Sequence, residues 1–476
     1  MFVKHFFLFS EDKNMKTKNK TKKRIKTNKI RTRPKRICRN DKPDLCVLFF
    51  TTINLLCVNL FKQLGAIFDH RKDKGKLYTT QTLMVTALFM FNLNLKSRAK
   101  ISQRLTKKRI IDKISYASGQ KLDFLPHGDT INDFLEKAKA EELEAILYSI
   151  NYDLLRSKRL DKFRFSDKYY TIAIDMTQTH YFHSKHHDNC QYCMEIKDKD
   201  DNVIGYQHAI VEAVLVTPTK LRIPIMSEFL CKQPASKKQD CEINAAIRLL
   251  KKLKKKYSKF KICILADGLY SNKNFFKLMK KFKWKFIFSF KESKIPKLHE
   301  KFEDFKKIKY SSYEETQPSY RIKRCFNFVN NLHHDDYSVN ILEITEYAYK
   351  EIEYYNIFLT NIEIDKKNLD TVSQTGRLRW QIELTFRDQK YKGFYIKHAY
   401  SHNPNAMLCF HLLLLMAYWI NQFMFQLHSE NGVNNLKSIF GSIENIILSL
   451  YEHFFEFDLN PADALKVNQA RFLEIS

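Results

Sequence analysis

The stretch KYYTIAID, residues 168–175, predicts the first strand of an α/β core. The run is apolar and rich in β-branched residues, and Asp175 stands where it ends. The stretch KICILAD, residues 261–267, repeats this arrangement and ends on Asp267. Polar residues at the ends of core strands often contribute to ligand sites in α/β sheets, although a single Asp there can simply begin a turn. We therefore expect the two carboxylates to lie at one site.

The segments around these two strands alternate between strand and helix patterns. Strand-like runs at 203–216 and 220–229 precede a helical run at 236–257, and a further helix and strand follow Asp267. This order predicts a mixed α/β sheet flanked by helices. The runs between 291 and 360 again alternate like strands, so we expect a β-rich insertion there.

A third motif, RLRWQIELTFRDQK, occupies residues 377–390 and predicts a helix. A helix turns about 100° per residue, so Arg379, Glu383 and Lys390 share one face, and Arg387 lies between the last two. Ion pairs on an exposed helix would be the ordinary interpretation. That interpretation does not explain why Glu383 follows two strand-end Asp residues. Apolar residues in the same run predict a buried side: Trp380, Ile382, Leu384 and Phe386.

Together, Asp175, Asp267 and Glu383 are suited to hold two magnesium or manganese ions. Magnesium prefers oxygen ligands and keeps several waters, so a few carboxylates suffice. Two such ions about 3.5–4 Å apart clamp the attacking and leaving oxygens of a phosphodiester displacement. The cations around Glu383 are then expected to contact DNA phosphates: Arg379, Arg387 and Lys390.

The segment HYFHSKHHDNCQYC, residues 180–193, contains a second group of possible ligands. Cys190 and Cys193 have the spacing of a zinc knuckle, and His187 and His208 could complete a structural zinc site. Two free thiols with histidines at the surface are the alternative. The other cysteines are mostly inside apolar runs and predict buried free thiols in a reducing compartment: Cys57, Cys263 and Cys409.

The charge balance indicates a polyanionic partner. The 476 residues contain 82 Lys and Arg against 52 Asp and Glu, a net charge of +30. Residues 1–45 hold 16 of the basic and 4 of the acidic residues, so most of the excess lies outside this arm. Residues 13–39 of the arm have no clean apolar stripe, which argues against a membrane-surface protein. The apolar run at 407–420 is short for a membrane span and contains His411, so we expect a core helix there and no membrane partner.

The patterns also predict how the chain is divided. We expect a basic disordered arm (1–45), a helical N-terminal domain that could touch DNA (46–165), the first part of the core (166–290), the β-rich insertion (291–360), the second part of the core with the Glu383 helix (361–427), and a helical C-terminal tail (428–476).

At these motifs the chain resembles the insertion-sequence DDE transposases that have a ribonuclease H-like core and a β-rich insertion between the second Asp and the Glu. The family pattern around the Glu is Tyr, two residues, Arg, three residues, Glu, six residues, Lys. Arg379, Glu383 and Lys390 match it, whereas Gly376 stands in the place of the Tyr. AIDMT around Asp175, ADGLYSN around Asp267 and KKQDCEINAAIRLLKKL before Asp267 are also similar. The resemblance extends over about residues 120–425.

The resemblance implies a cut-and-paste DNA transposase with Asp175, Asp267 and Glu383 as ligands of the metal ions. Such an enzyme would bind double-stranded DNA at the element ends, cleave it and join the 3′-hydroxyls to target DNA. It also implies a homodimer on paired ends, in a prokaryotic cytoplasm and associated with the nucleoid. A metal-dependent nuclease of the same fold and an inactive transposase-derived DNA-binding protein are the alternatives.

Overall fold

The computed structural model describes residues 44–74, 76–183, 190–232, 239–308, 312–317, 322–334, 336–348, 351–428, 436–460, 462 and 471–472. The described residues form one compact unit. Apart from its last two residues, the basic arm expected at 1–45 lies outside the described residues.

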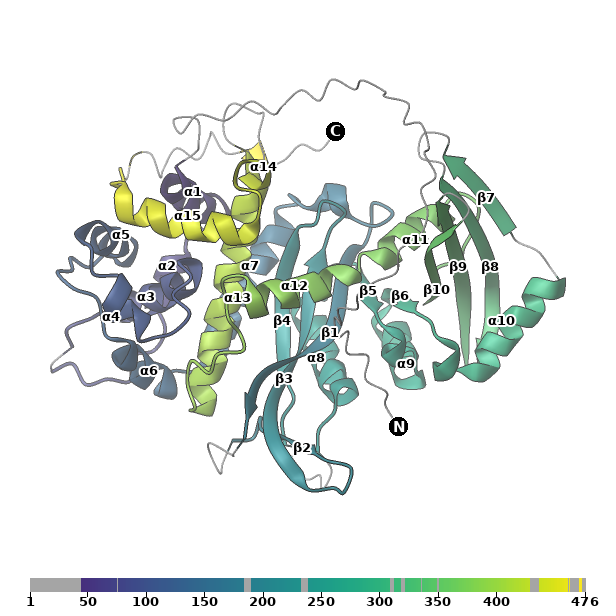
Figure 1. The fold of residues 1–476 in the computed structure, drawn as a ribbon, viewed down its shortest axis with the longest axis horizontal. Helices are drawn as coiled ribbons and strands as arrows, with labels where there is room; N and C mark the ends of the chain where they lie inside the picture. Colours follow the sequence, from purple (N-terminus) through teal and green to yellow (C-terminus); the bar gives the residue numbers. More distant parts are fainter. Residues whose placement is uncertain are drawn as a thin grey trace, which may run out of the picture. The chain divides into compact units, whose positions relative to one another are not determined.

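A 10-stranded mixed sheet runs through this unit, as Figure 1 shows. Its strands follow the order β2-β3-β1-β5-β6-β10-β9-β8-β7, and β4 pairs with β3 beside β2. The strands are β1 (Tyr170–Phe182), β2 (Met194–Lys197), β3 (Val203–Val216), β4 (Arg222–Phe229), β5 (Ile262–Ala266), β6 (Lys285–Ser289), β7 (Ser312–Gln317), β8 (Ile322–His334), β9 (Tyr337–Ala348) and β10 (Glu351–Thr360). A separate pair consists of β11 (Leu427–His428) and β12 (Arg471–Phe472).

The strand directions confirm the expected ribonuclease H-like core. The strands β1, β5 and β6 pair in parallel, whereas β3 runs antiparallel to β1 and to β4. The apolar run at 203–216 matches β3 residue for residue, and the strand is buried throughout from His208 to Val216.

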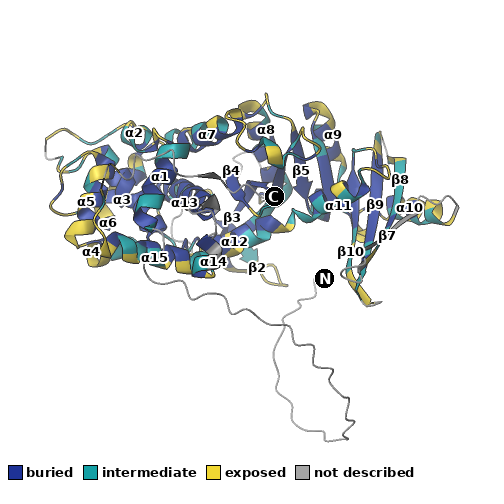
Figure 2. Cartoon of the chain, turned by 90° about the horizontal axis from the view of Figure 1, so that it is seen from above, coloured by how far each residue is buried: buried dark blue, intermediate teal, exposed yellow. Residues whose placement is uncertain are grey.

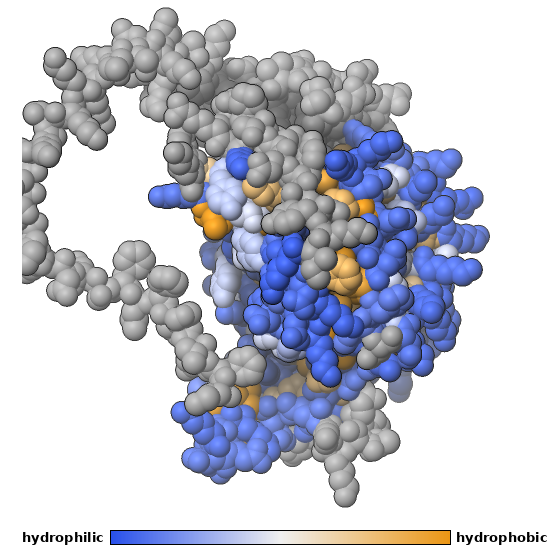
Figure 3. All heavy atoms as spheres, turned by 90° about the vertical axis from the view of Figure 1, so that its right-hand side faces the viewer, coloured by the Kyte–Doolittle hydropathy of each residue, from blue (hydrophilic) through white to orange (hydrophobic). Residues whose placement is uncertain are grey.

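The expected β-rich insertion continues the core sheet. Strand β10 pairs antiparallel with β6, so that Phe358 lies opposite Ser289, and β9, β8 and β7 follow outward. The insertion also contains a helix, α10 (Pro296–Ile308), that the strand-like pattern did not predict. In Figure 3, the visible surface of the described residues is mostly hydrophilic, with small apolar patches between the polar side chains.

Side-chain alternation gives the sheet two buried faces. Ile172 and Ile174 of β1 point to one apolar cluster, and Ala173 between them belongs to another. The helices on the Ile172 face are α8 (Glu242–Lys256), α9 (Lys273–Phe282) and α10. Those on the Ala173 face are α11 (Leu369–Arg377) and α12 (Trp380–Tyr391). Both faces are therefore covered, as in other layered α/β folds.

Helices from both ends of the chain pack together beside the sheet. They are α1 (Leu45–Leu56), α2 (Leu60–Gly65), α3 (Thr80–Asn92), α4 (Lys100–Arg104), α5 (Lys108–Ser118), α6 (Gly128–Lys137), α7 (Ala140–Arg156), α13 (Pro404–Gln426), α14 (Leu436–Phe440) and α15 (Ile443–Glu456). In the middle lies α13, which contacts α1, α3, α6, α7 and β4. In Figure 2 it is drawn largely in the colour of buried residues.

The apolar run at 407–420 lies in α13. Residues Pro404–Phe425 are long and apolar enough to cross a membrane, yet 94% of the most apolar window is buried inside the fold. Asn151 of α7 explains part of this packing, because it accepts a hydrogen bond from the Trp419 indole at 3.0 Å and donates to the Pro224 carbonyl of β4 at 3.0 Å. This single side chain connects α7, α13 and the sheet.

Buried polar contacts fix α12, the helix of the third motif, to the sheet. They are the hydrogen bond from Gln381 Nε2 to the Thr217 carbonyl (2.8 Å), the ion pair between Arg222 Nη2 and Asp388 Oδ2 (2.7 Å), and the hydrogen bond from Gln389 Nε2 to Glu212 Oε2 (3.0 Å). A buried polar group without its partner is costly, so these contacts favour one position of the helix.

Glu212 gives this arrangement a pH dependence. Burial raises the pKa of its carboxyl to about 7, although the hydrogen bond from Gln389 acts in the opposite direction. Between about pH 4.5 and 7 the unfolded chain has lost this proton while the folded chain keeps it. The stability of the fold therefore decreases as pH rises through this window.

We expect Glu212→Gln to remove this loss. The amide oxygen can still accept from Gln389, so stability near pH 5 should change little, whereas at pH 8 the variant should be more stable by on the order of 3 kcal/mol. Urea denaturation at several pH values measures the difference, with the exposed Glu353→Gln as the control. A difference that does not change between pH 5 and 8 would contradict the assignment.

Candidate active site

The pairing of β1 with β5 brings the two predicted Asp residues to the same level of the sheet. The last parallel pair is Ala173 with Leu265, and Asp175 and Asp267 each follow two residues later. Ala173 and Leu265 both belong to the apolar cluster beneath α11 and α12. Because side chains alternate along a strand, the two carboxylates continue on that same face, toward α12.

The two Asp residues differ in their local structure. Asp267 lies directly after β5, as expected, and its carboxylate accepts from the Leu269 N–H at 2.8 Å in a short 3₁₀ turn. Asp175, in contrast, lies inside β1 and not at its end. The strand continues because β3 pairs with it on the other side, where Glu212 is the partner of Asp175.

Glu383 and Arg379 come from the start of α12. Arg379 precedes the first residue of the helix but has helical dihedral angles, so it still lies one turn before Glu383. Its guanidinium donates to Glu383 Oε1 at 2.7 Å and lies 3.7 Å from Asp175 Oδ2. One cation thus connects the first and the third predicted carboxylates.

Negative charge accumulates around Asp175. Burial raises the pKa of its carboxyl to about 7, and the carboxylates of Glu242 and Asp267 act in the same direction. The Met176 N–H, which donates to Asp175 Oδ1 at 2.8 Å, and Arg379 act in the opposite direction. A carboxyl whose pKa is raised by neighbouring carboxylates is typical of sites that take up a cation.

The carboxylates fit divalent ions by their chemistry, since every donor is a hard oxygen. They are not drawn tightly together, however: among the described residues, Cys190, Cys193 and His208 are the one group of three potential ligands whose atoms all lie within 4.8 Å of one another. The guanidinium of Arg379 pairs with two of the three carboxylates, those of Asp175 and Glu383.

The other two predicted DNA contacts differ in exposure. The side chain of Arg387 is 54% exposed and only 4.0 Å from Asp388, whereas Lys390 is partly buried. Burial lowers the pKa of Lys390, and the nearby carboxylates of Glu212 and Asp175 raise it. Lys390 therefore faces the predicted site, while Arg387 faces solvent.

The predicted buried side of α12 is only partly right. Ile382 and Phe386 are buried, because they lie one turn apart and face the sheet. Leu384 is half-buried, and Trp380 is 56% exposed because it lies on a different side of the first turn. An exposed indole thus stands beside Arg379, with the guanidinium 5.9 Å from its ring centre.

Sequence reasoning missed a fourth carboxylate near the site. Glu242 begins α8 and accepts a hydrogen bond from the Tyr270 hydroxyl at 2.6 Å. Burial raises the pKa of Glu242, and the Asp267 carboxylate adds to this. Neither periodicity nor spacing marks Glu242, but it lies in the stretch KKQDCEINAAIRLLKKL, which already carries part of the family resemblance.

Gly376, the departure from the family pattern, has a steric explanation. A Cβ atom at this position would lie 2.5 Å from the ring of Phe358, a buried residue of β10. The aromatic ring of the insertion's last strand therefore occupies the space into which a side chain on α11 would extend. Within this packing no residue larger than Gly fits at position 376.

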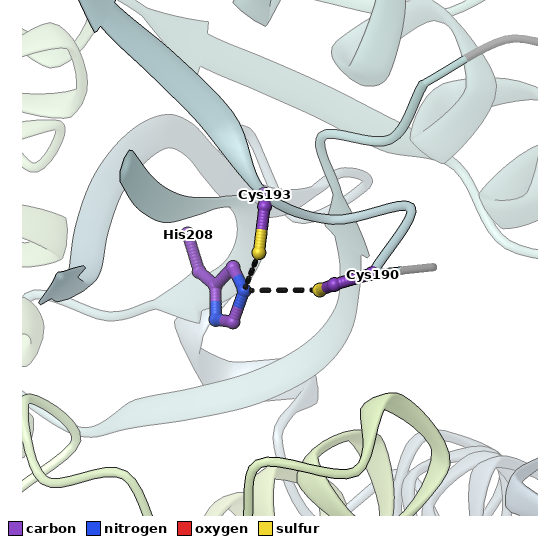
Figure 4. A group of neighbouring side chains, drawn as sticks. All are labelled: Cys190, Cys193 and His208. Atoms are coloured by element: carbon purple, nitrogen blue, oxygen red, sulfur yellow. Dashed lines mark hydrogen bonds between the residues drawn. The ribbon is translucent and has the colours of Figure 1, made fainter. Parts of the chain in front are cut away.

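The predicted zinc ligands come together in part. Cys190, Cys193 and His208 are neighbours, as Figure 4 shows. All three are buried, so the alternative with surface histidines does not hold for His208. His187 lies outside the described residues. The Cys193 thiol and the His208 ring lower the pKa of Cys190 to about 4. The expected buried free thiols are confirmed: Cys57, Cys263 and Cys409.

Comparison with known proteins identifies the family. Residues 168–420, more than half of the chain, match the family described as a transposase DDE domain, and they include Asp175, Asp267 and Glu383. The chain belongs to this family. The transposase is accordingly an enzyme that cleaves and joins DNA, DNA is its partner, and divalent ions serve the family in general.

The fold was also compared with solved structures, and the sequence with curated proteins. A piggyBac transposase synaptic complex with hairpin DNA, solved by cryo-electron microscopy, has a TM-score of 0.40 and 10% sequence identity, over 93% of this chain and 85% of that chain. No curated protein matches the transposase. The family assignment rests on the domain match.

The contact between Gly376 and Phe358 predicts an unusual effect of an alanine substitution on stability. Ala normally stabilises a helix by about 1 kcal/mol relative to Gly, yet we expect Gly376→Ala to destabilise the transposase by about 1–3 kcal/mol through the clash. Thermal unfolding measures this change. Phe358→Leu, which removes the ring, should make the same Gly376→Ala change neutral or favourable. Equal losses in both backgrounds would show that Phe358 is not the cause.

Proposed function

We propose that this transposase binds the ends of a DNA element, cleaves the strands there and joins the 3′-hydroxyls to target DNA. In this proposal Asp175, Asp267 and Glu383 hold two divalent ions, magnesium or manganese. The supporting observation is the register of β1 and β5, which sets Asp175 level with Asp267 on the sheet face that α12 covers with Glu383.

The bound ions would supply the Lewis acidity that activates a water or 3′-hydroxyl and stabilises the departing oxygen. The chain itself provides position and charge. Asp175 and Glu383 are held by strand pairing and by the docking of α12, so neither needs to move far. In the free enzyme, Arg379 neutralises the carboxylates of Asp175 and Glu383. Once divalent ions take over this role, its guanidinium would be available for the DNA phosphate next to the cleaved bond.

Positive and aromatic side chains on α12 would position the DNA. Arg387 extends into solvent and can reach a phosphate, whereas Lys390 lies closer to Asp175 and would contact the strand near the reacting bond. The exposed indole of Trp380 offers a flat surface on which a base could stack. Phosphate contacts of this kind fix the register of the DNA but carry no sequence information.

The action of two copies on paired element ends is part of the same proposal, since both ends of an element must be joined to one target. We also propose a prokaryotic cytoplasmic location in association with the nucleoid. The net charge of +30 supports association with DNA, both at element ends and in the nucleoid.

Conservative changes of the carboxylates test the proposed site. We expect Asp175→Asn, Asp267→Asn and Glu383→Gln each to lower strand cleavage and strand transfer to below a thousandth of the unmodified rate, equivalent to about 4 kcal/mol in the barrier. DNA binding should persist, because no cation is removed. The assay uses DNA that contains the sequences flanking the gene, with magnesium or manganese added.

The matched control for this assay is Glu353→Gln, a neutralised carboxyl on the exposed part of β10. It should cleave and join like the unmodified enzyme. Full activity in any one of the three site variants would remove that residue from the site. Cleavage without a joined product in the unmodified enzyme would indicate a nuclease and not a transposase of the proposed kind.

Salt dependence tests the proposed DNA contacts. Each phosphate contact releases counterions, so the affinity should fall steeply with salt, and Arg387→Gln should reduce the slope of log K against log[salt] by about 1. Lys255→Gln is the control, because this exposed lysine lies on α8, which covers the opposite face of the sheet. An unchanged slope in Arg387→Gln would place the DNA elsewhere.

A further inference from the structure

Two cysteines and a histidine from different segments of the chain lie close together in space, outside the proposed active site. Cys190 and Cys193 lie in the turn that leads into β2, where the Cys193 N–H donates to the Cys190 carbonyl at 3.4 Å. His208 belongs to β3, whose pairing with β2 begins one residue away, at Gln207. The pairing of the two strands therefore carries both thiols to the histidine (Figure 4).

The distances are those of a metal site. The Sγ atoms of Cys190 and Cys193 lie 3.4 Å and 3.2 Å from the same atom, His208 Nε2. Zinc bonds of about 2.3 Å to sulfur and 2.0–2.1 Å to nitrogen, at a tetrahedral angle, place such atoms about 3.6 Å apart. A shift of a few tenths of an ångström would thus suffice to accommodate the ion.

The three groups converge on one point inside the fold. Thiolate and imidazole are the ligands that structural zinc sites use most. In the structure both thiols point to His208 Nε2, and all three side chains are at most 5% exposed. A divalent cation at their common centre would contact all three groups at once and satisfy each of them.

We propose that Cys190, Cys193 and His208 bind a structural zinc ion. Thiolate and imidazole ligands select zinc over magnesium, whereas the oxygen ligands of the active site select magnesium, so the two sites would not compete for one ion. Three ligands come from the described part of the chain, and a tetrahedral site takes one further donor.

The position of the site suggests what the zinc would stabilise. Strand β3 pairs with β1 over the stretch that carries Asp175, and His208 lies further along β3 at the end where β2 joins. The turn at Cys190 is also tied to the end of β4, since the Lys232 N–H donates to the Gln191 carbonyl at 2.7 Å. Zinc would fasten this end of the β1–β3 ribbon without touching the proposed catalytic residues.

The first experiment measures metal content. The full chain, purified without chelator and without a metal-affinity step, should contain about one zinc per chain by inductively coupled plasma mass spectrometry. Cys193→Ser and His208→Asn should bring the content close to zero. Cys325→Ser is the control, because this half-buried cysteine lies on β8 in the insertion and should leave the zinc in place.

A second measurement uses the unmodified chain, so it does not require that any variant folds. Cobalt exchanged into the unmodified chain should give the visible bands of a tetrahedral site and a thiolate charge-transfer band, and X-ray absorption at the zinc edge should show two sulfur ligands. Magnesium or cobalt held only by carboxylates gives neither signal, so the result is independent of the active-site proposal. No bound zinc after incubation with excess zinc, or a Cys190–Cys193 disulfide in protein purified under mildly reducing conditions, would overturn the inference.

Discussion

The parallel register between β1 and β5 is the constraint on which the proposed active site depends. A shift by one residue would turn Asp175 or Asp267 to the other face of the sheet, away from α12. Apolar side chains hold the register, because Ile172 and Ile264 pack on one face while Ala173 and Leu265 pack on the other. Burial of the core thus sets the level of the two carboxylates before any ion or DNA is bound.

The third carboxylate depends on a different kind of contact. Glu383 is partly exposed, and its position follows from α12, which the buried Arg222–Asp388 pair and the glutamine contacts hold against β3 and β4. Removal of one partner from a buried ion pair leaves an uncompensated charge and is costly. These buried polar contacts, together with Ile382 and Phe386, therefore hold α12 in one position on the sheet.

Local sequence patterns predicted the features that depend on neighbouring residues in the chain, namely individual strands and helices. The strands around Asp175 and Asp267, the whole of β3 and the helix of Glu383 follow from apolar periodicity, and the order of the motifs indicated the family. Contacts between distant segments could not be predicted. The approach of Phe358 to Gly376, the proximity of Glu242 to Asp267 and the guanidinium of Arg379 between two carboxylates all arise from packing between elements. Trp380 was misplaced for a different reason. At 100° per residue it lies on another side of the helix than Ile382 and Phe386, so the four apolar residues do not share one buried side.

The points at which the chain leaves and re-enters the core lie side by side, because Ser289 of β6 is the pairing partner of Phe358 of β10. Nearly seventy residues intervene, yet the gap they span is one interstrand spacing, about 4.8 Å. Evolution could therefore lengthen, shorten or exchange the intervening segment, as at any closed loop, at small entropic cost. Such remodelling would change the number of residues between Asp267 and Glu383. It would leave their distance in space unchanged, provided β6 and β10 remain paired.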